Sequence, residues 1–182
     1  MKIAGIDYSI TSPAICIYDD SKPFCFENCE FRFLTDKKKY GKQIAPNIQG
    51  EFFKDYETDT QRFDNISQWA IDTIKGVNQV ALEGYAFSAQ GLIFNLAENC
   101  GLLKYKIYKE NLPLVIYEPG KIKKVAAGKG NSCKDIMYEA FVEQTKVELL
   151  KVFDQKTLSN PVTDLVDSYF IIKTHKLFTS SS

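Results

Sequence analysis

Several residue types are scarce in this chain of 182 residues, and each scarcity disfavours a class of protein. There is one histidine, His175, and the five cysteines form no Cys-x-x-Cys pair, which argues against a zinc centre and against a disulfide framework. No run approaches the about 18 apolar residues that a membrane helix needs, and the first predicted strand starts too close to Met1 for a signal peptide. We therefore expect a soluble cytoplasmic protein with reduced thiols and no membrane association.

Net charge is also absent, because 23 lysines and arginines balance 23 aspartates and glutamates. The lysines are nevertheless unevenly distributed. Eight of them lie between Lys104 and Lys134, where the only acids are Glu110 and Glu118, and an early loop holds Lys37, Lys38, Lys39 and Lys42. A solvated face is the ordinary explanation for any one lysine, but such clusters favour a phosphate-binding surface.

The apolar pattern predicts a single α/β domain over residues 1–178, followed by a disordered tail at 179–182. Strands are expected at 2–6, 13–18, 24–33, 77–82 and 112–117, and helices at about 59–75, 88–110, 119–127, 133–153 and 161–175. The polar, lysine-rich segment at about 34–64 is expected to be an inserted connecting lobe. Three hairpin-joined strands followed by two strand–helix units predict a five-stranded mixed sheet flanked by helices.

Four acids interrupt elements that are otherwise apolar. Asp7 and Glu83 each end a short strand, and ligand sites gather at the carboxyl ends of strands in open α/β sheets. Asp164 and Asp167 share one face of the last helix. A turn cap would explain Asp7, and the helix dipole would explain Asp164, but neither accounts for all four acids. Carboxylates gathered in one place repel one another, and Mg²⁺ or Mn²⁺ relieves that repulsion.

In four segments the chain resembles the RuvC family of Holliday-junction resolvases. The segments occur in family order and are GIDYS, ALEGYAF followed by NLAENCG, LPLVIYEPGKIKKVAAGKGNSCKD, and DLVD. Together they cover residues 2–18 and 77–176. The resemblance implies an RNase H-like fold and a homodimer that nicks two strands of a four-way DNA junction symmetrically.

The resemblance also implies roles for particular residues. It assigns Asp7, Glu83, Asp164 and Asp167 as ligands of two Mg²⁺ ions, for which Mn²⁺ would substitute. It places Lys134, and less securely Lys124, near the scissile phosphate. Lys121 and Lys129 are further expected DNA contacts. Tyr85 or Phe87 would touch the bases of the junction, or would simply pack in the core.

The 34–64 segment departs from the compact bacterial enzymes and looks more like a viral or phage branch. Three alternatives remain open: a broader RNase H-like nuclease acting on branched DNA or RNA–DNA hybrids, a junction-binding protein without catalytic activity, and an actin-like ATP-binding unit. Retention of four acids disfavours the second, and the absence of a second lobe or phosphate loop disfavours the third. The apolar face of the helix at 88–110 is a candidate dimer interface, with packing on the sheet as its alternative.

Overall fold

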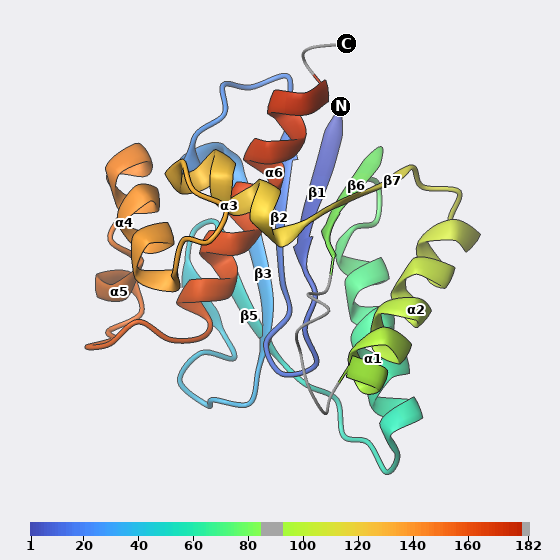
Figure 1. The fold of residues 1–182 in the computed structure, drawn as a ribbon. Coiled ribbons are helices and arrows are strands. Elements are labelled where there is room, and N and C mark those ends of the chain that lie inside the picture. The colour runs from blue at the N-terminus through green and yellow to red at the C-terminus, as the bar shows by residue number, and fades with distance from the viewer. Residues whose placement is uncertain (85–92, 180–182) are drawn as a thin grey trace.

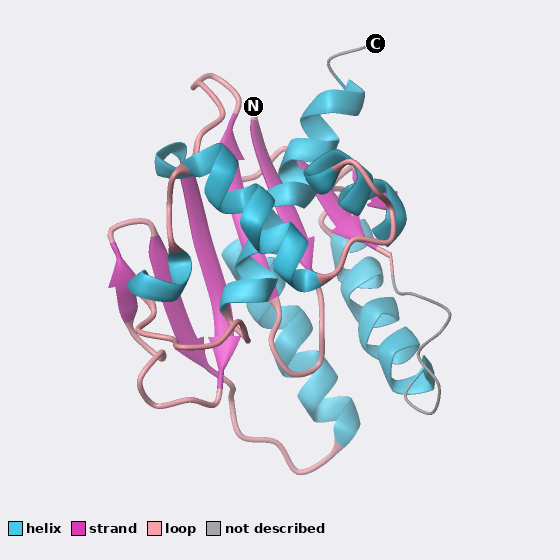
Figure 2. Ribbon diagram, turned by 60° about the vertical axis from the view of Figure 1, so that its left-hand side comes forward, coloured by secondary structure: helices cyan, strands magenta, loops and turns pink. Residues whose placement is uncertain are grey.

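The computed structural model describes residues 1–84 and 93–179. Within these residues a seven-stranded mixed sheet, in the order β4-β5-β3-β2-β1-β6-β7, lies between two layers of helices (Figures 1 and 2). The strands are β1 (Lys2–Asp7), β2 (Ala14–Asp19), β3 (Cys29–Thr35), β4 (Gln43–Ala45), β5 (Ile48–Phe52), β6 (Gln79–Glu83) and β7 (Leu114–Tyr117). The helices are α1 (Asp59–Thr73), α2 (Ile93–Lys109), α3 (Pro119–Ala127), α4 (Lys134–Thr145), α5 (Leu149–Val152) and α6 (Val162–Thr179).

The predicted α/β fold with a mixed sheet is confirmed, but the prediction of five strands is wrong. The additional strands, β4 and β5, lie in the 34–64 segment that was expected to be a connecting lobe. β5 pairs in parallel with β3, and β4 pairs antiparallel with β5 at the edge of the sheet. Their sequences are polar because one side of each strand faces solvent, so the apolar signal of a strand is weak there.

Several predicted boundaries also change. The expected strand at 24–33 begins instead as a 3₁₀ turn (Phe26–Asn28) before β3. The expected helix at 133–153 is divided, because Lys146 adopts a left-handed φ of 62° and ends α4. The last helix continues to Thr179, the first residue of the predicted tail.

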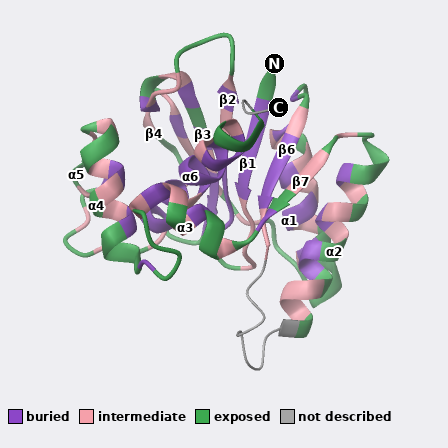
Figure 3. Cartoon of the chain, turned by 45° about the horizontal axis from the view of Figure 1, so that its top comes forward, coloured by how far each residue is buried: buried purple, intermediate pink, exposed green. Residues whose placement is uncertain are grey.

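The two faces of the sheet have different cores. α3, α4, α5 and α6 cover one face with an aromatic-rich core, whereas α1 and α2 cover the other with a mainly aliphatic core. α6 lies across the middle of the first face and is buried along most of its length (Figure 3). Its mainly apolar sequence is therefore explained by contacts on nearly every side.

Part of the apolar face predicted for α2 is buried. Cys100, Leu103 and Ile107 are buried in the core beneath α1 and α2. The packing alternative is therefore correct for these three side chains. The homodimer itself stays a prediction. In the ranges 1–84 and 93–179, no helix combines the length and the apolar character needed to cross a membrane.

Candidate active site

The central strands bring Asp7 and Glu83 side by side. β1 and β6 are parallel neighbours with Ile6 opposite Leu82, so each acid follows directly on a paired residue. Adjacent strands lie about 4.8 Å apart, and residues two positions apart point to the same face. Because Gly5 faces α6, Asp7 also does. By the same alternation Glu83 points to the α6 side of the sheet.

A close helix–strand contact adds the other two acids. α6 crosses β1 at Gly5, where an added Cβ would lie 2.8 Å from the carbonyl oxygen of Ser168 and 2.8 Å from Cγ1 of Ile172. Glycine is therefore required for this approach. Asp164 and Asp167 are less than two turns before the contact, so the first turns of α6 lie over the end of β1.

The four carboxyl groups perturb one another. Burial raises the pKa of Asp7 well above its usual range, and repulsion by the other three acids raises it further. Burial, followed by repulsion from Asp167, raises the pKa of Glu83 to about 7. The pKa values of Asp164 and Asp167 are each raised to about 6, again mainly by burial. The site therefore concentrates negative charge that the protein itself does not fully compensate.

Two lysines face these acids. Lys134, the first residue of α4, lowers the pKa of all four carboxyl groups, and Lys123 on α3 lowers the pKa of Glu83 and Asp167. Lys134 was a predicted site residue, whereas Lys123 was not. Lys124, which was predicted in its place, is exposed. Lys123 lies about one helical turn after Pro119, and both residues line the same cleft. Helical spacing could therefore have identified Lys123.

The other predicted DNA contacts lie elsewhere or are not described. The ammonium of Lys121 is 3.4 Å from the ring centroid of Phe178, at the opposite end of α6 from the acids. Lys129 is exposed in the loop between α3 and α4. Tyr85 and Phe87 lie outside the described residues. DNA contact by any of these side chains stays a prediction.

A cleft of about 310 Å³ opens beside the acids. Its lining includes Asp7, Glu83, Asp167, Lys123, Lys134 and Cys100. A larger groove of about 540 Å³ lies along β2, β3 and β5, but its charged residues alternate in sign, as Lys22, Glu30 and Arg32 illustrate. The smaller cleft gathers three acids, whose mutual repulsion favours binding of an external cation, so we take it as the candidate active site.

Asp164 is not part of the cleft lining, and its carboxyl group is hydrogen-bonded. The Ser12 hydroxyl, on the turn after β1, donates to Oδ2 of Asp164, and the Thr163 hydroxyl lies 3.4 Å from Oδ1. Asp164 is only 6% exposed. The hydroxyl of Ser12 is the foremost influence that lowers the pKa of Asp164 against the effect of burial. Ser12 therefore fixes the orientation of this carboxyl group.

The chemistry of the donor set fits a divalent cation. Carboxylate oxygens are the ligands that Mg²⁺ and Mn²⁺ prefer, and the mutual repulsion of four carboxylates favours binding of positive charge. The side chains do not close around an ion as they stand, because among the described residues no three acidic, histidine or cysteine side chains form a metal-binding group.

Comparison with known proteins identifies the fold. No protein-family model matches the chain, and no curated protein matches it. The structure of Thermus thermophilus RuvC aligns with 100% of this chain and 96% of its own at TM-score 0.62 and 19% identity. T. thermophilus RuvC in complex with Holliday junction substrate aligns over the same shares at TM-score 0.67 and 15% identity. The yeast mitochondrial Holliday junction resolvase Ydc2 aligns with 94% of this chain and 76% of its own, at TM-score 0.56 and 13% identity.

These matches confirm the predicted RuvC-like fold of the RNase H-like type. At 13–19% identity they establish the fold and leave the chemistry to be argued from the residues of this chain.

Proposed function

We propose that this protein is a metal-dependent, structure-selective endodeoxyribonuclease that resolves four-way DNA junctions by paired symmetric nicks. One observation carries the proposal: acids from β1, β6 and α6 gather beside a cleft that Lys123 and Lys134 also line. A cleft with both charges suits a phosphodiester, because the lysines attract the phosphate and the carboxylates hold the cations that the reaction needs. The RuvC-like fold supports the choice of a branched substrate.

Asp7, Glu83, Asp164 and Asp167 would hold two Mg²⁺ ions, with Mn²⁺ as a substitute. When bound, such ions activate a water for attack on phosphorus and stabilise the leaving oxygen. Attack by water breaks the bond between phosphorus and the 3′ oxygen and leaves 5′-phosphate and 3′-hydroxyl ends.

The lysines and Ser12 complete the role of the protein in this scheme. Lys134 and Lys123 neutralise the scissile phosphate and fix its position without reading sequence. Ser12 keeps Asp164 in one orientation. A homodimer would place two such sites on a substrate that has approximate two-fold symmetry. The cytoplasmic location and the viral or phage branch stay predictions.

Cleavage of a synthetic four-way junction tests the proposal. A linear duplex and an RNA–DNA hybrid are assayed beside it, each with Mg²⁺ and with EDTA. We expect paired nicks in the junction alone, and no cleavage in EDTA. Equal cleavage of the hybrid would instead indicate a broader RNase H-like nuclease. Tight junction binding with no cleavage under Mg²⁺ or Mn²⁺ would indicate a binding protein.

Metal binding is tested separately from cleavage. Thermal unfolding without DNA is recorded in EDTA and in Mg²⁺, for the wild type and for Asp7→Asn. Mg²⁺ at ten times its Kd should stabilise the wild-type protein by about 1.4 kcal/mol. We expect a smaller stabilisation of Asp7→Asn, and an identical gain in both proteins would place the ions elsewhere.

A further inference from the structure

The lysine-rich loop at residues 36–42, between β3 and β4, leaves the sheet at the same edge as the acids. β1 and β3 both pair antiparallel with β2, so their carboxyl ends share that edge. There the N–H of Leu34 donates to the carbonyl oxygen of Pro13 at 3.1 Å. Pro13 follows Ser12, the residue that orients Asp164. The loop therefore begins beside the turn that supports the candidate active site.

The loop also contacts the turn that precedes α6. The ammonium of Lys37 donates to the carbonyl oxygen of Asn160 at 3.0 Å, although 123 positions separate them in the sequence. The side-chain oxygen of Asn160 accepts a hydrogen bond from the Thr163 hydroxyl at 2.7 Å. Because Thr163 is next to Asp164, Asn160 links the lysine loop to the start of α6, where two of the acids lie.

The loop is held in a fixed conformation. Tyr40 is 3% exposed, its ring lies 5.3 Å from that of Phe153, and its hydroxyl donates to the Phe153 carbonyl oxygen at 3.3 Å. Gly50 of β5 is packed beneath it, since an added Cβ would lie 2.0 Å from the carbonyl oxygen of Tyr40. The inserted strands therefore support the loop, and less conformational entropy would be lost when a ligand binds it.

The loop presents positive charge to solvent. Lys37, Lys38, Lys39 and Lys42 are exposed, and the loop contains one acid, Asp36. None of the four lysines takes part in an ion pair within the described part of the chain. Two strand spacings place β3 about 10 Å from β1. This is well within one turn of B-DNA, about 34 Å.

We propose that the lysine loop at 36–42 binds the phosphate backbone of a duplex arm whose scissile strand lies in the acidic cleft. The inference rests on the proposed function and adds a binding surface to it. It also gives a purpose to the inserted strands β4 and β5, which hold the loop beside the site. Contacts of this kind fix the register of DNA without reading its sequence.

The test replaces Lys38 and Lys42 together with glutamine, in an Asp7→Asn background that allows binding to be measured without cleavage. Lys37 is left in place because it bonds Asn160, and Lys39 because its ammonium lies 4.5 Å from the ring centroid of Tyr40. Affinity for a four-way junction is measured by fluorescence anisotropy over a series of NaCl concentrations. Loss of two phosphate contacts should reduce the slope of log K against log salt by about 2, and the affinity roughly tenfold.

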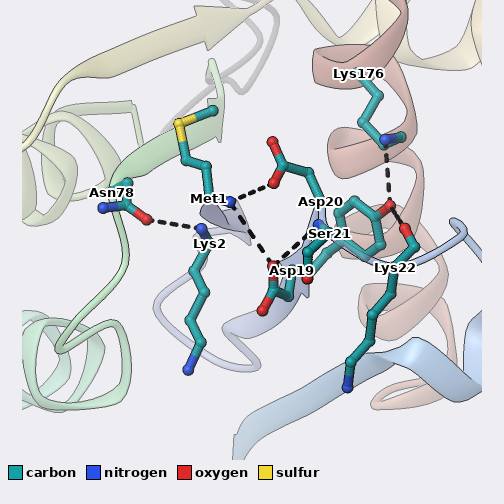
Figure 4. Close-up of polar contacts among 9 residues, drawn as sticks. Met1, Lys2, Asp19, Asp20, Ser21, Lys22, Asn78 and Lys176 are labelled. Carbon is teal, nitrogen blue, oxygen red and sulfur yellow. Dashed lines mark hydrogen bonds and ion pairs between the residues drawn. The ribbon is translucent and has the colours of Figure 1, made fainter.

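A matched control removes two lysines from the opposite edge of the sheet. Lys2 and Lys22 are exposed there, and neither ammonium takes part in a contact drawn in Figure 4. The Lys2→Gln, Lys22→Gln double variant changes net charge equally and should retain the parent's salt slope. The single variant Lys38→Glu repeats the test with one changed position, and unfolding temperatures check that every variant folds.

The outcomes separate the inference from the proposed function. If the parent binds the junction and the Lys38, Lys42 variant keeps the same salt slope, the loop does not bind phosphate. The inference also fails if the control pair loses as much affinity. If the parent binds neither junction nor duplex, the proposed function fails and the inference fails with it.

Discussion

Acidic residues gather at both ends of β1, and the two groups have opposite electrostatics. At the amino-terminal edge Asp19 and Asp20 lie beside the terminal ammonium of Met1, which is 3.8 Å from Asp19 and forms a hydrogen bond with Asp20 (Figure 4). Hydrogen bonds from Ser21 lower the pKa of Asp19. At the carboxyl edge burial and the other acids raise the pKa of Asp7.

The two edges of the sheet differ in the source of the compensating positive charge. The chain supplies its own cation at the amino-terminal edge, where solvent also screens the exposed charges. At the carboxyl edge Lys134 and Lys123 offset four half-buried or buried acids only in part. Those acids are therefore suited to binding a cation from solution. Their mutual repulsion lowers the stability of the folded protein, which is a consequence of that function.

The largest expected effect is the loss of cleavage on substitution of Asp7. Asp7→Asn should lower junction cleavage by roughly 1,000-fold, equivalent to about 4 kcal/mol, because it removes the carboxylate at the centre of the site. Asp19→Asn, the matched change at the other edge, should leave cleavage within about twofold of the wild type. Single-turnover cleavage in Mg²⁺ measures both.

Asp7→Asn and Asp19→Asn should also differ in thermal stability. In EDTA at pH 8 we expect Asp7→Asn to unfold at a higher temperature than the wild type, because a repelling buried charge is lost. Asp19→Asn should not gain stability. Equal loss of cleavage in both variants would contradict the assignment of the site.

A second expected effect is a dependence of the free energy of unfolding on pH. Burial raises the pKa of Glu83 from an ordinary 4.5 to about 7, so the folded protein binds more protons than the unfolded chain between these values. In EDTA the free energy of unfolding should therefore fall as pH rises from 4.5 to 7, by up to about 3 kcal/mol from this group. Urea unfolding at several pH values measures the trend, and Glu83→Gln should flatten it. Stability that rises over the same range would rule out this charge arrangement.

The smallest effect concerns the hydroxyl that orients Asp164. Ser12→Ala removes a hydrogen bond to a charged group, worth about 1.5–3 kcal/mol, and we expect kcat to fall roughly tenfold with KM for the junction unchanged. Ser12→Thr keeps a hydroxyl and should recover much of the rate. Ser9→Ala is the control, because the Ser9 hydroxyl accepts from the backbone N–H of Ser12, at 2.9 Å, and its removal leaves the Ser12 hydroxyl in place. A change confined to KM would assign Ser12 to substrate binding instead.

Tertiary packing determines the environment of His175. A histidine near the C-terminal end of a helix ordinarily favours the helix dipole when protonated. The structure buries His175, with Nδ1 3.1 Å from the Tyr117 hydroxyl. Burial lowers its pKa, which disfavours the protonated form. The strand that covers it is more than fifty positions away and leaves no trace in the local pattern.

The sequence by itself determined the mixed α/β fold and the four acids, because short apolar strands and an apolar helix make each interrupting carboxylate conspicuous. Local pattern could not reveal the short strands β4 and β5, because one side of each faces solvent. Only the tertiary structure decided that Lys123 lines the cleft, that part of the apolar face of α2 packs inward, and that the lysine loop lies beside α6. Each of these depends on contacts between distant segments, which are set by how the helices pack on the sheet rather than by neighbouring residues.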